Sequence, residues 1–299
     1  MNKAFKLIWK SLCLFMPQTA AKIQYKHIMR QSIDFSNPRD INEKINFLKF
    51  NSDLEEWARL SDKYAVRDYL KERGLNDILV PLYGKYDNAK ELLNDWDNFP
   101  QSFIIKANHG CGTIKLVRDK EKVNKIHLEK EMSAWLKDKY GLETNERHYL
   151  KIKPCLIVEA LLEDNSVKDF SRSLIDYKIW CFDGKPYCIL VCVDRNIDNT
   201  DAEHYVHLDT YDLQWNRIEN SMSDIVSLPS QKIPKPQNLE RMLKCASLLS
   251  QNHKQVRVDL YNIDGKIYFG EMTFTSQSGY MNYFSREFLL ELGDQINLK

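Results

Sequence analysis

The chain has 299 residues, enough for two or three subdomains that each bury a core. Its 43 basic and 42 acidic residues leave a net charge of +1, so no field of one sign favours nucleic acid as a partner. The seven cysteines follow no regular spacing, which argues against a disulfide framework and is typical of a reducing compartment. We therefore expect a cytoplasmic globular protein that does not bind nucleic acid.

The first residues combine a basic start with an apolar stretch over residues 7–16, which imitates a signal peptide. Lys10 and Ser11 interrupt this stretch, it is too short to span a membrane, and no clean cleavage site follows it. We predict an amphipathic helix packed on the body of the protein, and keep contact with a membrane surface as the alternative. Residues 1–60 as a whole are expected to be mostly helical.

Beyond residue 60, apolar periodicity and turn signals predict helices mixed with mostly antiparallel strands. The predicted helices cover residues 62–73, with Tyr64 and Leu70 on the inner face, and then residues 121–140 and 237–252. The predicted strands cover residues 103–107, 114–117, 155–159, 174–182, 185–193, 255–261 and 266–275. A polar stretch from about residue 195 to 236 is expected to be irregular. This mixture predicts an α+β fold.

A lysine inside an apolar strand precedes a glycine-containing loop. Lys106 is followed by residues 108–113, which include His109, Gly110 and Gly112. A lysine in such a strand is costly unless it meets a negative partner, and glycines let backbone N–H groups approach phosphate oxygens. The loop is not a Walker loop, because no Gly-Lys-Ser/Thr closes it. We predict phosphate binding; a tight hairpin with an exposed lysine, and a surface role for the histidine, are the alternatives.

Two late strands carry a second polar set. Alternation places Arg257 and Asp259 on one face of the first strand, and Glu271 and Thr273 on one face of the second. A two-residue turn between the strands would point the two carboxylates in opposite directions. A three-residue loop over residues 263–265 would bring them to one face. We predict the three-residue loop.

Two carboxylates with further oxygen ligands nearby suit Mg²⁺, which takes few protein ligands and bridges substrate phosphates. A purely structural cluster of arginine and carboxylates is the alternative. Lys178 lies in an otherwise apolar strand, on the same face as Asp176. We expect this lysine to face a nucleotide or a substrate carboxylate, with an ion pair to Asp176 as the alternative.

Six runs in this order resemble the teichuronopeptide-synthesis-type, or TupA-like, family of the ATP-grasp superfamily. They are residues 42–44, 62–67, 106–110, 176–184, 256–261 and 268–274. The resemblance implies an ATP-grasp fold, in which two α+β subdomains clasp ATP, after a short and mostly helical N-terminal region. The implied divisions are residues 1–60 for that region, 61–170 for the small subdomain with a preceding helix, and 171–299 for the large, metal-binding catalytic subdomain.

The resemblance also implies the residues that bind the nucleotide. Lys63 and Lys106 would contact the phosphates, and the loop after Lys106 would cover them. Residues 156–162 resemble the hinge strand that holds adenine, with a ribose-binding carboxylate just after it. The nucleotide-binding set is therefore Lys63, Lys106, His109, Gly110, Gly112, Thr113, Glu159, Ala160, Leu162 and Glu163.

The activity that the resemblance implies is ATP-dependent carbon–nitrogen ligation through an acyl phosphate. Arg257 and Lys178 are the expected catalytic residues, and Asp259, Glu271 and Thr273 would hold magnesium, with two ions implied. Thr273 stands where the wider superfamily has asparagine. The implied substrates are a small-molecule or sugar-linked carboxylate and an amine, in capsule, O-antigen or teichuronopeptide synthesis. The implied location is the cytoplasm or the inner face of the membrane, and a homodimer stays open.

Three other functions fit part of the pattern. A glycosyltransferase would use Asp-x-Asp to hold a metal and a sugar nucleotide, and Asp95-Trp96-Asp97 has these letters in a polar loop. A non-catalytic binding protein on a decayed ATP-grasp fold would have lost its charged residues, whereas Lys106, Arg257, Asp259 and Glu271 are all present. A kinase-like transfer without ligation is the third alternative.

Overall fold

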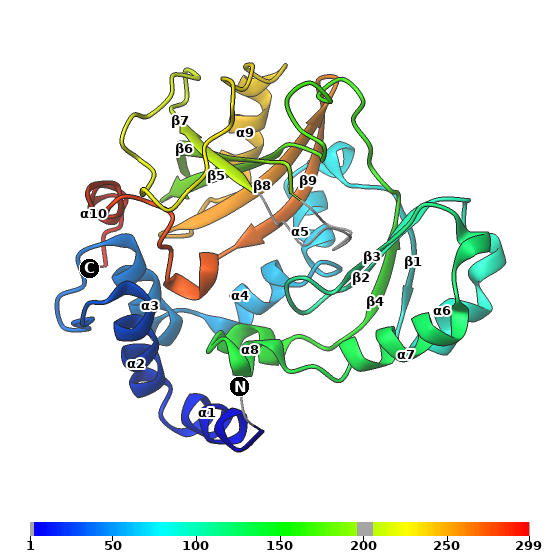
Figure 1. Cartoon of the computed structure of the whole chain (residues 1–299), viewed down its shortest axis with the longest axis horizontal. Helices are drawn as coiled ribbons and strands as arrows, with labels where there is room; N and C mark the ends of the chain where they lie inside the picture. Colours follow the sequence, from blue (N-terminus) through cyan, green and yellow to red (C-terminus); the bar gives the residue numbers. More distant parts are fainter. Residues whose placement is uncertain (1–2, 196–205, 299) are drawn as a thin grey trace. The chain divides into compact units, whose positions relative to one another are not determined.

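The computed structural model describes residues 3–195 and 206–298 (Figure 1). They form two compact units. Unit 1 comprises the described residues of Met1–Asp53, Leu142–Glu146 and Asp164–Lys299, and unit 2 comprises Leu54–Gly141 and Arg147–Glu163. The first 53 residues, which lie within the expected N-terminal helical region, thus belong to the same compact unit as the C-terminal part of the chain.

Unit 2 is built on a four-stranded antiparallel sheet. Its order is β1 (Leu82–Tyr86), β4 (Leu156–Glu159), β2 (Phe103–Ala107) and β3 (Ile114–Val117). The predicted strands at 103–107 and 114–117 and their hairpin pairing are confirmed. Strand β1 is absent from the predicted elements because Gly84 and Lys85 interrupt its short run, and glycine and lysine are both depleted in strands.

Two helices cover one face of this sheet, α6 (Ala89–Asn94) and α7 (Lys125–Trp135). The core between them includes Leu92, Phe103, Ile105, Met132 and Val158. Because side chains alternate along a strand, Ile104 and Lys106 of β2 and Glu159 of β4 lie on the opposite face. The polar residues of interest in unit 2 therefore lie on the face away from α6 and α7.

Helices α4 (Leu54–Ser61), α5 (Val66–Glu72) and α8 (Tyr140–Glu143) complete the α-helices that contribute to unit 2. The prediction of a helix from residue 62 is wrong at its start. The Asp62 carboxylate accepts hydrogen bonds from the backbone of Tyr64 and Ala65 and holds a turn there, and Tyr64 is exposed. The helix predicted over 121–140 is shorter, because Asn124 caps α7 and the helix ends at Trp135.

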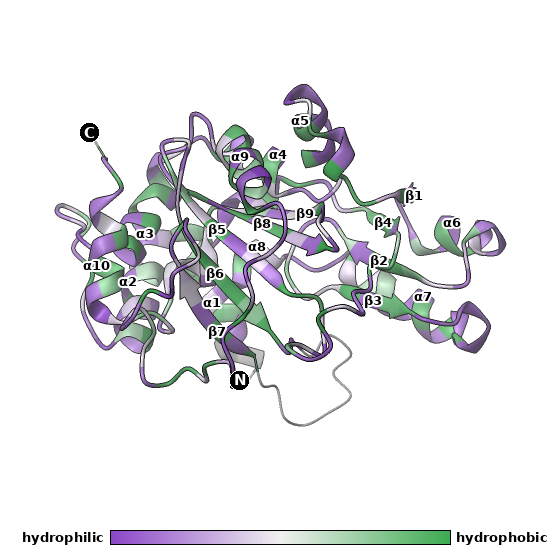
Figure 2. Ribbon diagram, turned by 90° about the horizontal axis from the view of Figure 1, so that it is seen from above, coloured by the Kyte–Doolittle hydropathy of each residue, from purple (hydrophilic) through white to green (hydrophobic). Residues whose placement is uncertain are grey.

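Unit 1 contains a five-stranded antiparallel sheet. Its order is β7 (His207–Tyr211), β6 (Lys185–Val193), β5 (Asp176–Phe182), β8 (Val256–Ile263) and β9 (Lys266–Thr273). Helix α9 (Leu239–Leu249) packs across β5, β6 and β8, and Figure 2 shows its mixture of hydrophobic and hydrophilic residues. Strand β7 lies in the stretch that we expected to be irregular. It is a strand because it pairs with β6, a contact that its local sequence does not indicate.

The remaining helices of unit 1 are α1 (Lys3–Phe15), α2 (Pro17–Met29), α3 (Ile41–Asn51) and α10 (Arg286–Asp294). Together with α4, the first three confirm the mostly helical character expected of the N-terminal region, and α3 packs against α10. Among the residues that the structure describes, no helix is both long enough and apolar enough to cross a membrane.

The hairpin of β8 and β9 closes with a two-residue turn, so the predicted three-residue loop is wrong. Asp264 and Gly265 both have positive φ, 50° and 82°, and Ile263 pairs directly with Lys266. The two carboxylates nevertheless face each other, because the register shifts between Asp259 and Leu260. Gly270 is the extra residue of this bulge, so Leu260 pairs with Phe269 while Asp259 pairs with Glu271.

The bulge predicts a specific cost for enlarging Gly270. A Cβ atom there would lie 2.9 Å from the carbonyl oxygen of Asp259, inside van der Waals contact. We expect Gly270→Ala to lower the free energy of unfolding by about 1–3 kcal/mol, measured by urea denaturation. Lys266→Ala, at the exposed start of the same strand, is the matched control and should change it by less than about 0.5 kcal/mol. Parental stability of Gly270→Ala would contradict this account of the bulge.

Candidate functional site

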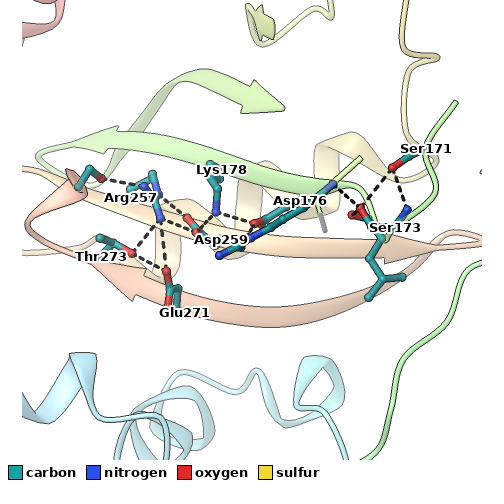
Figure 3. Close-up of polar contacts among 11 residues, drawn as sticks. Ser171, Ser173, Asp176, Lys178, Arg257, Asp259, Glu271 and Thr273 are labelled. Carbon is teal, nitrogen blue, oxygen red and sulfur yellow. Dashed lines mark hydrogen bonds and ion pairs between the residues drawn. The ribbon is translucent and has the colours of Figure 1, made fainter. Parts of the chain in front are cut away.

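The polar face of the unit 1 sheet gathers charged side chains from three adjacent strands. Lys178 of β5 is the cross-strand partner of Asp259, and Asp259 is in turn the partner of Glu271. Arg257 pairs across the strands with Thr273. Figure 3 shows the polar contacts that join these side chains. Cys181 of β5, on the opposite face of the strand, contacts the carbonyl of Ala246 in α9, so the cluster lies on the face away from α9.

Lys178 lies between two carboxylates. Its Nζ is 2.6 Å from Asp176 Oδ2 and 2.5 Å from Asp259 Oδ2. All three residues are buried, with Asp259 only 2% exposed. The ion pair with Asp176, considered as an alternative from the sequence, is present, and Asp259 is a second partner that the sequence did not indicate.

Arg257 holds the other side of Asp259 with a two-pronged contact. Its Nε and Nη2 donate to the two carboxylate oxygens at 2.7 and 2.6 Å. Nη2 also lies 3.2 Å from Thr273 Oγ1 and 3.4 Å from Glu271 Oε1, and Nη1 donates to Ser276 Oγ at 2.9 Å. A two-pronged arginine–carboxylate contact fixes geometry as well as charge, so Arg257 orients the whole cluster.

The charges of the cluster keep both cations protonated. Burial by itself lowers the pKa of the Lys178 ammonium, but the carboxylates of Asp176 and Asp259 outweigh burial and raise it. The pKa of Arg257 is likewise raised, since Asp259 outweighs the effect of burial. Burial raises the pKa of Asp259, against the opposing effects of Arg257 and Lys178. Arg195 Nη1 also pairs with Asp176 Oδ2 at 3.3 Å, so the cluster holds three carboxylates, Asp176, Asp259 and Glu271, against three cations, Lys178, Arg195 and Arg257.

The donor set fits magnesium, which prefers hard oxygen ligands. Asp259 and Glu271 face each other, Thr273 Oγ1 donates to Glu271 Oε1 at 3.1 Å, and the Glu271 side chain is 39% exposed. Asp176 Oδ1 is buried without a hydrogen-bond partner in the part of the chain that the structure describes. Within residues 3–195 and 206–298, no three His, Cys, Asp or Glu side chains form a group that could hold a metal by themselves. A magnesium ion here would therefore take further ligands from the substrate phosphates.

In unit 2, Glu159 joins two cations on the face of the four-stranded sheet that lies away from α6 and α7. Its Oε2 accepts from Lys106 Nζ at 2.8 Å, and its Oε1 accepts from Arg67 Nη1 at 2.9 Å. Arg67 also donates to the carbonyl of Val80 at 2.9 Å. Lys106 therefore meets the negative partner that a lysine in an apolar strand requires, within its own unit.

The loop after Lys106 is held at its base. The Asn108 side chain accepts from the backbone N–H of Cys155 at 2.8 Å and donates to the carbonyl of Lys153 at 3.0 Å. Lys63 Nζ donates to the carbonyl of Gly110 at 2.5 Å. The base of the loop is thus fixed. Lys106 lies directly before this loop and Lys63 contacts it, so both lysines of the predicted phosphate site lie beside the same loop.

The next residues of this loop, His109 to Thr113, differ in how far they are buried. His109 is buried and its ring contacts the carbonyl of Asp138 at 3.2 Å, and burial lowers its pKa. Gly112 has a φ of +77°, and a Cβ atom there would meet nothing within 4 Å, while Thr113 is half-buried. The surface position considered for the histidine is therefore wrong, and the glycine lies at an open tip.

The hinge residues follow directly after β4. The Ala160 N–H donates to the carbonyl of Pro81 at 2.9 Å, and Leu162 is half-buried. Glu163 pairs with Arg118 at 2.8 Å, and both side chains are exposed. Of the four predicted adenosine-binding residues, Glu159 is the one whose side chain forms ion pairs with Arg67 and Lys106.

The loop that follows β9 has an unusual backbone. Gln277, Ser278 and Gly279 have φ of 42°, 54° and 76°, three left-handed residues in succession. Such a conformation is unfavourable for the first two, so contacts must hold it. Gly279 permits both its own φ and the approach of Asn46, whose Nδ2 would be 2.7 Å from a Cβ there.

One face of helix α3 supplies these contacts. Asn46 Nδ2 donates to the carbonyl of Gly279 at 2.7 Å, and Asn42 exchanges two hydrogen bonds with the backbone of Met281 at 2.9 and 3.0 Å. Lys49 donates to the carbonyl of Ser278 and lies over the Tyr280 ring. The spacing of these α3 residues, four and three apart, places them on one stripe of the helix.

Glu146, almost fully buried, holds the same loop from another side. It accepts hydrogen bonds from the hydroxyls of Thr275 and Ser278, the latter at 2.9 Å. Ser276, between them, is the residue that accepts from Arg257. The loop is therefore continuous with the Arg257 cluster.

Sequence reasoning missed several of these residues. Arg67 stands in the run of residues 62–67 and was given no role, although an arginine on a helix beside two phosphate-site lysines is a usable signal. Lys49 and Glu146 carried no signal, since only the tertiary structure brings them to the loop after β9.

Comparison with protein families defines the class first, the ATP-grasp superfamily. Within this class, the model described as TupA-like ATP-grasp matches residues 43–297, and the chain belongs to this family. The resemblance, the fold class and the assignment to ATP-grasp ligases expected from the sequence are thereby confirmed. No curated protein matches the chain.

Solved structures show a distant likeness. The D-alanine–D-alanine ligase of Helicobacter pylori is 16% identical, with a TM-score of 0.44 over 86% of this chain and 69% of that one. That of Bacillus anthracis complexed with ATP is 16% identical, with a TM-score of 0.43 over 86% and 66%. The ATP-grasp ligase PsnB complexed with minimal precursor, Mg and ADP is 14% identical, with a TM-score of 0.38 over 84% and 63%. The chain thus spans about two thirds of the length of these proteins.

The buried lysine of α3 predicts a pH dependence of stability. Burial lowers the pKa of Lys49 to about 8, against the opposing effects of Glu146 and Cys13. Between pH 8 and the ordinary value of 10.5, the unfolded state then binds more protons than the folded state, so the free energy of unfolding rises with pH. We expect a rise of up to about 3 kcal/mol in the parent relative to Lys49→Met, measured by denaturant unfolding across this range. A flat difference between the two proteins would contradict the buried ammonium.

Proposed function

We propose that the protein joins a carboxylate to an amine, driven by ATP and through an acyl phosphate. The observation that carries this proposal is the buried cluster on β5, β8 and β9, in which Arg257 and Lys178 hold Asp259 beside Glu271 and Thr273. Its carboxylate and hydroxyl oxygens, with the Glu271 side chain 39% exposed, are the hard donors that a divalent cation prefers. Membership of a family of ATP-grasp carboxylate–amine ligases supports the same reaction class.

The charges of unit 2 support the nucleotide-binding part of the proposal. Lys63, Arg67 and Lys106 are three cations with the carboxylate of Glu159 among them. A net positive group beside a glycine-containing loop suits a polyphosphate. We assign the phosphates to Lys63, Lys106 and the loop with His109, Gly110, Gly112 and Thr113, and the adenosine to Glu159, Ala160, Leu162 and Glu163.

The proposed reaction has two steps. A carboxylate oxygen attacks the γ-phosphorus of ATP, the bond from this phosphorus to the β,γ-bridging oxygen breaks, and ADP leaves. The amine nitrogen then attacks the acyl carbon, loses a proton and expels phosphate, which leaves an amide. Arg257 would hold the acyl phosphate and the tetrahedral species that follows, since its fixed guanidinium stabilises developing negative charge without rearranging. Magnesium, held by Asp259, Glu271 and Thr273, would neutralise phosphate charge; we expect two ions.

The substrate class we propose is a sugar acid, free or carrier-linked, and an amino acid or similar amine, in surface-polysaccharide synthesis. The support is membership of the TupA-like family. We also propose that the enzyme works in the cytoplasm at the inner face of a membrane, as a peripheral protein.

The surroundings of the Asp95-Trp96-Asp97 motif do not support the glycosyltransferase alternative. Asp95 accepts hydrogen bonds from Tyr86 and from Asn98, and Trp96 is buried in the core of unit 2. The side chain of Asp97 is almost fully exposed. Asp95-Trp96-Asp97 therefore closes a helix end and anchors a core.

Ligand binding tests the proposed class first. A ligand at a hundredfold excess over its Kd stabilises a protein by about 2.7 kcal/mol, which a thermal shift detects. We expect a non-hydrolysable ATP analogue with Mg²⁺ to raise the Tm, and UDP- and ADP-sugars to leave it unchanged. A shift with a sugar nucleotide and none with the ATP analogue would promote the glycosyltransferase.

Turnover tests the metal and catalytic assignments. We expect Asp259→Asn and Glu271→Gln each to lower kcat for ADP release, with acid and amine present, by about a hundredfold or more. Asp97→Asn, which changes an exposed carboxylate of the other unit, is the control and should keep parental kcat. ADP release that needs no amine would point to kinase-like transfer, and near-parental turnover in either variant would remove the metal assignment.

A further inference from the structure

Helix α1 presents an apolar stripe outward. Leu7, Ile8, Leu14 and Phe15 are 68%, 66%, 46% and 78% exposed. Their spacing of one, seven and eight residues places them on one side of the helix, with exposed Ser11 between them. A helix on the surface of a globular protein normally turns its apolar side inward, so this stripe faces the wrong way for a purely structural helix.

The opposite side of α1 is what attaches it to unit 1. Cys13 is buried, Trp9 Nε1 donates to the carbonyl of Glu143 at 2.9 Å, and Lys10 pairs with the Glu143 carboxylate at 2.7 Å. The helix is therefore docked by one side and leaves the stripe exposed as a fixed surface.

The charge around the stripe indicates its partner. Residues 1–33 contain no aspartate or glutamate, and their basic residues are Lys3, Lys6, Lys10, Lys22, Lys26 and Arg30. Lys6, on the flank of the stripe, and Lys26 of α2 are exposed. An apolar stripe beside basic side chains is the pattern of a helix that lies in the interface of an anionic lipid bilayer.

We propose that the outward stripe of α1 docks on the surface of an anionic phospholipid membrane. This inference deepens the membrane location under the proposed function, but it rests on α1 and α2 alone and does not require the ligase reaction. Leu7, Ile8, Leu14 and Phe15 enter the interface, and the lysines lie at the level of the phosphates.

Vesicle flotation tests the proposal with the full chain. We expect binding to vesicles of phosphatidylcholine mixed with phosphatidylglycerol, weakening as salt rises, and little binding to phosphatidylcholine alone. The double variant Leu7→Ser, Phe15→Ser should bind the anionic vesicles at least about tenfold more weakly, because it no longer buries these two apolar side chains in the bilayer. Its Tm should be unchanged, since both side chains lie outside the core. Ile126→Ser removes an isoleucine of α7 that is even more exposed, at 84%, and should bind as the parent.

Three outcomes would overturn the proposal. The first is equal binding by the parent and the double variant. The second is equal binding to neutral and anionic vesicles, which would remove the charge argument. The third is that neither protein binds vesicles, while the parent is a dimer and the double variant is a monomer. This result would make the stripe an interface between copies of this chain.

A second inference comes from the loop after β9 and rests on the proposed function. We infer that Lys49 and Glu146 are positioning residues that act on Arg257 through Ser276. They hold Ser278 and Thr275, on either side of Ser276 along the chain, while Ser276 accepts from Arg257. Without them Ser278 and Thr275 lose these contacts, and Ser276, the partner of the Arg257 guanidinium, is no longer held from both sides.

Two readouts separate this role from general destabilisation. We expect Lys49→Met and Glu146→Leu to lower kcat about tenfold or more while the Kd for the ATP analogue stays parental, and Glu146→Gln, which keeps hydrogen-bonding atoms, to recover most of the loss. Amides of residues 276–281 should exchange faster in the first two variants. Asp209→Asn breaks the ion pair of the buried Asp209 with the partly exposed Arg217 elsewhere in unit 1 and should change neither readout. Parental exchange in this loop overturns the inference even if the parent proves inactive as a ligase, and parental kcat in a folded Lys49→Met overturns it directly.

Discussion

Burial of charge on one face of the unit 1 sheet is the constraint on which the rest of that unit depends. Asp176, Lys178, Arg257 and Asp259 are each less than a tenth exposed. A charge out of water costs several kcal/mol unless partners neutralise it, and removing one partner strands the others. Strand β8 must therefore lie between β5 and β9, because only there can Asp259 meet Lys178 on one side and Glu271 on the other.

The backbone adapts to this requirement at two places. The bulge at Gly270 shifts the register by one residue, so that a tight two-residue turn and a shared polar face coexist in one hairpin. After β9 the chain enters three left-handed residues, and the polar stripe of α3 with Glu146 holds them there. Both features are unfavourable locally, and both are kept by contacts that reach the Arg257 cluster.

Unit 2 also neutralises a buried charge with partners, here a carboxylate with cations. One carboxylate, Glu159, sits between Arg67 and Lys106, and Lys63 reaches the loop that follows Lys106. The three cations of this group suit the phosphates of a nucleotide, and the carboxylate oxygens of the unit 1 cluster suit magnesium, so the two groups are complementary to the two parts of a magnesium–nucleotide complex. This complementarity is the physical basis on which we assign the nucleotide to one set of residues and the metal to the other.

The sequence by itself determined the strands of both sheets that carry an apolar signal, the identity of the charged residues on β2, β5, β8 and β9, and the family. These follow from alternation and from short runs of residues, which are local properties of the chain. Tertiary structure alone decided that Asp259 and Glu271 meet through a bulge, that Lys178 has two carboxylate partners, and that Lys49 and Glu146 reach the loop after β9. Each of these depends on register or on contacts between residues far apart in the chain, and a register shift of one residue reverses every side chain of a strand without changing its pattern.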